Sequence, residues 1–529
     1  YMTKSSILVT KEVEDKLNTF QAVLTGSNNP LSPNLAKAVP EIVPEPRPSN
    51  LLPSSEKSYI DALLETNKAR SNGLQHRLWE RIQRQSWPEE NWHSVNIVDQ
   101  RVIIKDGNPF RTEVVIINNP EDAEIIGKSH VKKNPLFTPF LFESLIATTD
   151  NEHWKKQRNH FNEVFLPLSS LAPIFPISVN RAEKCVDILE DLRLHAGPYG
   201  VQMHDFYLHE AQAQLQLGLF GVDEKFMNDT NEGIRDAFAG RNPNMNFAKD
   251  MCLDMMSGKG QGPLAKSVAE AAETLDLNLQ DQFGNMMLIL FAGHDTTGHT
   301  MTWLTFELAR HPQYQDMLHA EVDTFLQQLN GRKMEYSDLD KLPFMTRCIM
   351  ETLRLWPAVA DGTHRELEYD TEVTAPNGDF VTLAKGTYVQ IPNWSRHRNP
   401  ELWGDDADQF NPLRDFQEKE LWEGTYAGFN PYTERFSPFA FAPRDCLGKN
   451  FAHMEMRAIL TNVFSTYRFE LSEPYKQSVA YREVNNGTMG PRDLRPEALA
   501  QEEERVKNNK RPLLGMWLHV TPRELKCNL

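Results

Sequence analysis

Apolar positions at helical spacing dominate the middle of the chain. Between residues 150 and 355 the pattern is mostly helical, and its longest uninterrupted stretch runs from Leu279 to Arg310. At a rise of about 1.5 Å per residue, a helix of this length would extend roughly 48 Å. His311 and Pro312 follow, and proline cannot continue a helix from that side because it lacks the amide hydrogen. The pattern therefore predicts one long central helix in a mainly helical fold.

Short runs of β-branched and aromatic residues lie on both sides of this helical region. Residues 102–104 and 114–117 are separated by a Gly-Asn-Pro turn signal at 107–109 and predict strands joined by a turn. Later strands are expected at 372–374, 380–383, 388–391 and 514–520. The stretch 393–438 between them should be irregular, with a helix resuming near Leu447. These patterns predict a mainly α fold with small β-sheets: one large helical domain with a smaller, β-rich N-terminal lobe.

The N-terminal part of the chain has a different character. Residues 30–54 are rich in proline and predict an extended arm, followed by a helix at about 58–85. We therefore divide the chain into an N-terminal extension, 1–54, and a main domain, 55–529. Residues 1–20 carry several lysines and acids, so they can neither span a bilayer nor form the apolar core of a signal peptide. No transmembrane segment is expected.

Charge and cysteine content exclude several kinds of function. The formal net charge of -17 argues against a nucleic-acid partner, because phosphate binding needs a surplus of lysine and arginine. The five cysteines are scattered, odd in number and contain no Cys-x-x-Cys pair, which argues against a disulfide framework or a cysteine-rich zinc site. A reducing compartment is the natural interpretation, and we expect a cytoplasmic protein.

A cysteine in a loop directly before a helix is the strongest chemical signal. Residues 439–452 read Phe-Ala-Phe-Ala-Pro-Arg-Asp-Cys-Leu-Gly-Lys-Asn-Phe-Ala. Thiolate is the form of cysteine that binds metal, and a helix N-terminus after Cys446 would stabilise its negative charge. Gly448 would let the backbone approach a flat cofactor beside the apolar Phe439, and Arg444 could pair with a cofactor carboxylate. A buried structural cysteine is the alternative for this segment taken alone.

A second signal interrupts the long central helix. Residues 292–297 read Ala-Gly-His-Asp-Thr-Thr. Glycine inside a helix costs about 1 kcal/mol relative to alanine, and threonine hydroxyls can bond backbone carbonyls and bend the helix. Gly293 beside Asp295 and Thr296 therefore indicates a place where the helix makes room for something, although a polar helix face with a chance glycine is the alternative. His294 is interpreted as a pocket or packing residue.

Together these motifs resemble the cytochrome P450 family. The family's cysteine loop reads Phe-x-x-Gly-x-Arg-x-Cys-x-Gly, and this chain differs only at Ala442. Ala442 precedes Pro443 and is therefore biased toward extended backbone, where alanine pays no penalty. The resemblance covers residues 55–522. It implies heme b (iron protoporphyrin IX) as the cofactor, with Cys446 as the ligand of its iron.

The resemblance also implies roles for other residues near the heme. Thr296 would steady the iron-bound dioxygen, Asp295 would belong to the proton supply, and Ala292 and Gly293 would adjoin the cofactor. The remaining heme-binding candidates are Trp154 and Arg158, which match a Trp-x-x-x-Arg helix, and Arg365, for which His364 is a rival.

A third motif, Glu351-x-x-Arg354, is implied to be structural. In the family this pair joins an arginine from the downstream irregular stretch in a buried network that fixes the cysteine loop. Arg414 is the candidate for that arginine, and Arg435 is a rival for the same place.

The activity implied by the resemblance is that of a heme-thiolate monooxygenase. Such an enzyme inserts one oxygen atom of O2 into a small hydrophobic substrate, by hydroxylation or epoxidation. We see no flavin or nicotinamide fingerprint and no cysteine set for an iron–sulfur cluster. A separate electron-donor protein, a flavin reductase or a ferredoxin, is therefore expected. It could dock on a basic face formed by Lys155, Lys156, Arg444 and Lys449.

Two alternatives remain open at this point. One is a peroxide-driven or isomerase-type heme enzyme of the same fold, in which the acid–threonine pair is often lost. The other is a non-catalytic heme sensor, which would normally be joined to an output domain. The substrate itself is not readable from the sequence, because apolar pockets carry little positive information about their ligands. The predicted pocket segments are 137–146, 203–221, 286–297, 358–363 and 486–489.

Overall fold

A computed structural model describes a large part of the chain. The described residues are 97–105, 108–135, 141–238, 250–252, 254–255, 259–375, 378–421, 431–476, 481–484, 488–507 and 513–523. The predicted proline-rich arm, the helix predicted at 58–85 and the proposed boundary after residue 54 lie outside these residues, as do 137–140 and 486–487 of the predicted pocket. The domain division therefore stays a prediction.

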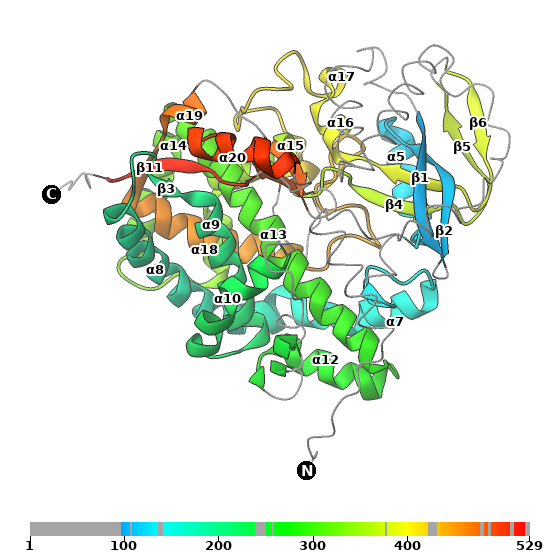
Figure 1. Cartoon of the computed structure of the whole chain (residues 1–529), viewed down its shortest axis with the longest axis horizontal. Helices are drawn as coiled ribbons and strands as arrows, with labels where there is room; N and C mark the ends of the chain where they lie inside the picture. The colour runs from blue at the N-terminus through cyan, green and yellow to red at the C-terminus, as the bar shows by residue number, and fades with distance from the viewer. Residues whose placement is uncertain are drawn as a thin grey trace.

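Helices form most of the described chain, as predicted (Figure 1). In chain order they are α5 (Pro120–Ser129), α7 (Asn151–Asn162), α8 (Ala172–Leu194), α9 (Met203–Gln214), α10 (Glu224–Phe238), α12 (Pro263–Thr274), α13 (Leu279–Arg310), α14 (Pro312–Leu329), α15 (Pro343–Leu355), α16 (Asn393–Arg398), α17 (Pro400–Trp403), α18 (Lys449–Thr466), α19 (Glu473–Lys476) and α20 (Pro496–Lys507). Short 3-10 or π turns are η2 (Glu163–Phe165), η3 (Pro167–Leu171), η4 (Leu215–Phe220), η6 (Tyr336–Lys341) and η7 (Glu418–Glu420).

The long helix α13 crosses the middle of the molecule, with α8, α9, α10 and α18 on one side and, on the other, α5 and α7 with β1 (Ile97–Lys105), β2 (Asn108–Ile116) and β4 (Thr363–Glu366) (Figure 1). It has the predicted limits, because Asn278 caps its first turn by accepting a bond from the Asp281 amide at 2.9 Å. Glycines let neighbours approach it closely. A Cβ at Gly298 would lie 2.9 Å from the Leu208 Cα on α9, and one at Gly284 would lie 2.4 Å from the Leu141 carbonyl oxygen. These contacts hold α9 and the segment before α7 tightly against α13.

The strands form small sheets, and the two strands predicted near the N-terminus pair as a hairpin. One sheet has the order β1-β2-β7-β4, in which β2 and β7 are parallel. The strands are β1 (Ile97–Lys105), β2 (Asn108–Ile116), β3 (Val201–Gln202), β4 (Thr363–Glu366), β5 (Thr371–Thr374), β6 (Phe380–Leu383), β7 (Tyr388–Ile391), β8 (Tyr467–Leu471), β9 (Tyr481–Val484), β10 (Thr488–Pro491) and β11 (Trp517–Pro522).

Three details differ from the sequence predictions. The β-rich lobe is not purely N-terminal, because β4 and β7 join the hairpin across more than two hundred residues of chain. The stretch 393–438 is not wholly irregular, because it contains α16, α17 and η7. The last strand begins at Trp517 rather than at residue 514, since Leu514 instead forms an isolated bridge with Arg492. Local apolar pattern could not reveal these long-range pairings.

Among the described residues, no single helix combines the length and the apolar composition that crossing a bilayer requires.

Candidate functional site

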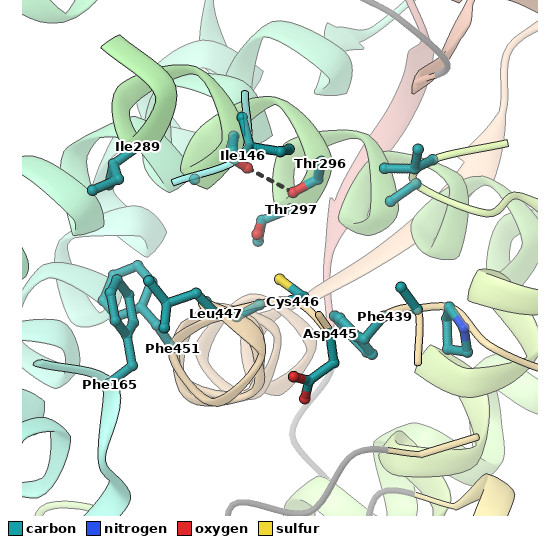
Figure 2. A pocket seen from close by; sticks show the side chains of 18 of the residues that line it. Ile146, Phe165, Ile289, Thr296, Thr297, Phe439, Asp445, Cys446, Leu447 and Phe451 are labelled. Carbon is teal, nitrogen blue, oxygen red and sulfur yellow. Dashed lines mark hydrogen bonds between the residues drawn. The ribbon is translucent and has the colours of Figure 1, made fainter. Parts of the chain in front are cut away.

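A cavity of about 310 Å³ lies between α13 and the loop that leads into α18. Figure 2 shows the Cys446 sulfur pointing into this space beneath Thr296 and Thr297 of α13, while the Asp445 carboxylate points away from it. The predicted site residues that line the cavity are Trp154, Arg158, Ala292, Gly293, Thr296, Phe439, Arg444, Cys446 and Gly448. The structure therefore gathers residues from α7, α13 and the cysteine loop around one sulfur atom.

The cysteine loop is held by its own backbone. The Cys446 amide donates to the Phe439 carbonyl at 2.8 Å, and Gly448 is the residue before the first turn of α18. Burial raises the pKa of the Cys446 thiol, while the Lys449 charge and the Gly448 amide act in the opposite direction. The left-handed residue of this loop is Ala440, with φ 62°, and Ala442 is not among the positive-φ residues of the described chain. Alanine at the family's glycine position therefore fits this backbone.

One end of the cavity carries buried positive charge, and among the described residues none of its three cations forms an ion pair with a carboxylate, although Glu368 acts on the two arginines from a distance. Lys133 and Arg444 line the cavity, and Arg365 lies directly behind. Burial lowers the pKa of Arg444 to about 9 and that of Arg365 to about 10. Burial and these two guanidinium groups hold the pKa of Lys133 well below its usual value. Each arginine also has two buried nitrogens without a hydrogen-bond partner among the described residues.

This cluster fits the two carboxylates of the expected heme. Two propionates would neutralise the buried cations and satisfy the unpartnered guanidinium nitrogens. The Arg444 guanidinium also lies 4.6 Å from the centre of the Trp154 ring, which holds it at the cavity wall. Lys133 was missed by sequence reasoning, since a lysine that follows another lysine in a loop gives no local signal. Neither Arg365 nor its rival His364 lines the cavity, but Arg365 is the one that acts on Lys133 and Arg444.

Arg158 has a different set of partners from the one expected. Its two terminal nitrogens donate to the backbone oxygen and a carboxylate oxygen of Asp445, at 2.7 and 2.8 Å. Lys449 binds the other oxygen of the same carboxylate at 2.8 Å. The residue directly before Cys446 is thus clamped between α7 and α18. Arg158 positions the cysteine loop as well as lining the cavity.

These contacts correct the predicted docking face. Lys449 and Arg444 are buried, the first against Asp445 and the second in the cavity wall. Only Lys155 and Lys156 of the predicted basic group are exposed on α7. On a helix, the spacing of residues along the chain indicates which side chains share a face. In a loop the spacing does not indicate which charged side chains fold inward.

The polar segment of α13 divides between two sides of the helix. Thr296 lines the cavity, and its hydroxyl donates to the Ala292 carbonyl at 2.8 Å (Figure 2). Asp295 does not line the cavity; it is buried on the side where His299 lies. The space above Gly293 is filled by the Leu215 side chain, which a Cβ would meet at 2.9 Å. The glycine therefore makes room for a neighbouring helix as well as adjoining the cavity.

Glu455 is a cavity residue that the sequence analysis missed. It is fully buried on α18, and neither of its carboxylate oxygens has a hydrogen-bond partner among the described residues. Burial raises the pKa of the Glu455 carboxyl well above its usual value, and the nearby Thr297 hydroxyl only partly counteracts this. Ala452, Glu455 and Met456 share the cavity-facing side of α18. The sequence signal that could have identified Glu455 is an acidic residue on an otherwise apolar side of α18.

Replacing Glu455 with glutamine is expected to stabilise the protein as pH rises. In the unfolded chain the Glu455 carboxyl ionises near pH 4.5, whereas in the folded chain it stays neutral to higher pH. The free energy of unfolding of the wild type therefore falls as the pH rises from 4.5 toward the folded-state pKa of this group. The glutamine variant should exceed wild type by about 1–3 kcal/mol at pH 8 and by less at pH 5. Urea unfolding at both pH values measures this, with Glu473→Gln at an exposed site as control. An equal difference at both pH values would contradict a neutral Glu455.

Glu351, Arg354 and Arg414 meet in the interior. The Arg354 guanidinium binds both oxygens of Glu351, at 2.7 and 2.8 Å, and both side chains are fully buried. Arg414 approaches the same carboxylate at 3.4 Å. Arg435, the rival, instead binds Glu420 at 2.6 Å. Of the two sequence candidates, Arg414 is therefore the one that reaches Glu351.

This network is connected to the cysteine loop through one histidine. Arg354 donates to the His397 carbonyl at 2.8 Å, and the ring of His397 accepts from the Ser437 amide at 3.0 Å. Ser437 is followed by the segment that carries the Phe439 carbonyl, to which Cys446 is bonded. The route from Arg354 to the sulfur therefore consists of specific hydrogen bonds and short stretches of chain.

Apolar side chains make up much of the remaining cavity wall, including the aromatic Phe165 and Phe451. The aliphatic ones come from four of the predicted pocket segments and include Leu145, Ile146, Leu215, Leu288, Ile289 and Val359. The wall segment before α7 is fixed to α13, since the Leu145 amide donates to the Asn285 side chain at 2.9 Å. Among the described residues, no three histidine, cysteine or acidic side chains cluster as a metal site.

Comparisons with known proteins agree with these features. Residues 222–484 match the family model described as Cytochrome P450. The chain is 28% identical over 305 residues to "Putative cytochrome P450 CYP13A5" of Caenorhabditis elegans, covering 56% of this chain and 55% of that protein. It is 31% identical over 257 residues to "Probable cytochrome P450 313a1" of Drosophila melanogaster, covering 46% and 49%.

Two further matches, a plant protein and a solved structure, agree with these relatives. The chain is 32% identical over 199 residues to "Secologanin synthase 1" of Catharanthus roseus, covering 38% of this chain and 35% of that protein. The crystal structure of a cytochrome P450 named CYP102L1 matches with a TM-score of 0.60 and 19% identity, over 80% of this chain and 91% of that one. At that identity it shows the fold alone. The chain spans about half the length, or less, of the curated relatives it matches.

Proposed function

This chain belongs to the cytochrome P450 family, and we propose that it is a heme-thiolate monooxygenase. In this proposal it binds heme b and inserts one oxygen atom of O2 into a small hydrophobic substrate, by hydroxylation or epoxidation. The observation that carries the proposal is the Cys446 sulfur, which enters a cavity roofed by Thr296 and bounded at one end by buried cations. A thiolate, a hydroxyl and a carboxylate-binding end are the parts that such a site requires.

Thiolate-held heme supplies the chemistry that activates dioxygen for insertion into a C–H or C=C bond. The protein's own residues do the remaining work. Cys446 would bind the iron as a thiolate, which the Gly448 amide and Lys449 would stabilise. Arg444, Arg365 and Lys133 would hold the carboxylates of the cofactor.

The α13 side of the cavity handles the substrate and protons. The Thr296 hydroxyl faces the cavity and donates or accepts a proton there, and Asp295 supplies the proton from behind the helix. Leu145, Ile289 and Val359 surround the substrate and exclude water, which suits an apolar molecule. These aliphatic side chains do not indicate which apolar molecule is the substrate.

Electrons come from a separate protein in this proposal. A flavin reductase or a ferredoxin would dock where α7 exposes Lys155 and Lys156. An acidic surface on the donor would complement these charges, and salt would weaken the encounter. Location in the cytoplasm stays a prediction from the cysteine pattern.

The carbon monoxide difference spectrum of the dithionite-reduced holoprotein tests the proposal. A strongly red-shifted Soret band is expected for a thiolate-held heme. A histidine-like band in folded, heme-loaded protein would overturn it. Substrate-dependent consumption of reductant then separates a monooxygenase from a peroxide-driven enzyme, an isomerase or a sensor.

Thr296→Ala is expected to keep the spectrum and lose coupling. Without this hydroxyl the proton route assigned to Thr296 is broken, so product per reductant should fall about tenfold while released peroxide rises. The two quantities are measured together during reductant oxidation. Thr302→Ala is the matched control, because Thr302 makes the same type of bond to a helix carbonyl, at 2.7 Å, but does not line the cavity. Unchanged coupling in Thr296→Ala would contradict the assigned role.

A further inference from the structure

Two buried histidines meet on the side of α13 that faces away from the cavity. His204 lies in the first turn of α9 and His299 on α13, one turn beyond Asp295. Their Nε2 atoms are 3.1 Å apart, and the residues are 3% and 2% exposed. Gly298 permits this contact, since its missing side chain lets α9 approach α13 closely. We propose that His204 and His299 relay protons to Asp295, an inference that rests on the proposed function.

The hydrogen bonds determine which atoms carry the protons. The His299 Nδ1 atom lies 2.6 Å from the Asp295 backbone carbonyl, which can only accept, so this nitrogen carries hydrogen. In the neutral ring Nε2 of His299 is then the acceptor. The facing Nε2 of His204 must therefore be the donor. The two rings therefore share one directed N–H···N hydrogen bond, in which His204 on α9 donates and His299 on α13 accepts. The tautomers are assigned from the hydrogen-bond partners of each ring.

A proton can pass along this pair of rings without either ring carrying more than one positive charge. A proton binds Nδ1 of His204, and the Nε2 proton of His204 moves to Nε2 of His299. The Nδ1 proton of His299 then passes to the Asp295 carboxylate, whose nearest oxygen is 3.6 Å away. One proton enters and one leaves, and no electrons move. Rotation or reverse exchange restores the starting tautomers. Asp295 directly precedes Thr296 in α13, so the carboxylate that takes the proton lies one residue along the helix from the hydroxyl at the roof of the cavity.

The surrounding charges suit such a route. Asp205 follows His204 in the chain, is 47% exposed and pairs with Arg235 of α10, which puts a solvent-facing carboxylate on the same turn of α9 as the first ring. Burial lowers the pKa of the neighbouring His294 to about 4, with Asp295, Arg235 and His299 also acting on it. His294 therefore stays neutral and does not compete for the proton.

His204→Gln is the most informative variant. The glutamine amide can still donate to His299, but it cannot bind a proton at neutral pH, so packing and hydrogen bonding are separated from relay. Heme-loaded protein is supplied with electrons by an NADPH-driven flavin reductase, using 7-ethoxycoumarin as the probe substrate. NADPH, oxygen and peroxide are followed in H2O and D2O between pH 6 and 8. His319→Phe is the control, since His319 is buried between α14 and β8, where its Nε2 lies 3.2 Å from the Tyr467 carbonyl.

We expect His204→Gln and His299→Phe each to raise the peroxide fraction about fivefold to tenfold and to increase the solvent isotope effect. The peroxide fraction of the double variant should be no higher than that of either single variant, because both substitutions block the same proton route. If His204→Gln has the same solvent isotope effect and pH profile as the wild type, the proposed relay is overturned. ¹⁵N spectra of histidine-labelled holoprotein give an independent readout of the two tautomers. Absence of a thiolate band in the wild type would instead overturn the proposed function, and the ¹⁵N spectra would still decide whether the directed pair exists.

Discussion

Cys446→Ser is expected to abolish the red-shifted carbon monoxide band and the turnover of the holoprotein. Serine keeps the size of the side chain but offers an alcohol, which is a far weaker anion and a poorer electron donor to iron than thiolate. Turnover should fall at least about a thousandfold, which corresponds to roughly 4 kcal/mol of activation free energy. The measurements are the reduced carbon monoxide spectrum, heme content and product formation from one preparation.

The control for this prediction is Cys252→Ala. Cys252 is fully buried and its sulfur lies 3.7 Å from the Met287 sulfur, away from the cavity lining. Its removal should lower stability modestly and leave the spectrum intact. A thiolate band that survives in Cys446→Ser would show that another residue binds the iron. Loss of the band in both variants would point to a general failure of folding.

Arg354→Ala is expected to have the largest effect on stability. Removing this arginine leaves the buried Glu351 carboxylate with the Asn411 amide, which donates to it at 2.9 Å, and the longer 3.4 Å contact to Arg414 as its remaining cation. It also leaves the carbonyls of His397, Ala407 and Gln409 without its donors. Breaking a buried ion pair from one side costs about 3–5 kcal/mol. Urea unfolding should register that loss, and heme retention should fall because His397 connects the network to the cysteine loop.

Arg354→Lys and Lys128→Ala bracket this result. Lysine keeps the charge but lacks the planar fork that binds Glu351 through two nitrogens, so Arg354→Lys should recover only part of the loss. Lys128 forms an exposed ion pair with Glu124 one helical turn away, and its removal should cost less than about 1 kcal/mol. A loss in Arg354→Ala as small as that of Lys128→Ala would mean that the network does not support the fold.

The sequence by itself determined the features that depend on neighbours along the chain. The limits of α13 follow from the Asn278 cap and Pro312, and helix or strand periodicity located most other elements. The cysteine loop could be read because its residues act within a dozen positions of Cys446. The Glu351–Arg354 pair could be read because three positions is one helical turn.

Only the tertiary structure decided which distant groups meet. Arg414 and Arg435 both follow Arg354 at plausible distances along the chain, and the fold pairs one with Glu351 and the other with Glu420. Lys133 joins the cation cluster, Asp295 turns away from the cavity and His204 meets His299 across 95 residues. Periodicity assigns a residue to a face of its own helix, but the partner of that face depends on how helices and loops pack, which local pattern does not encode.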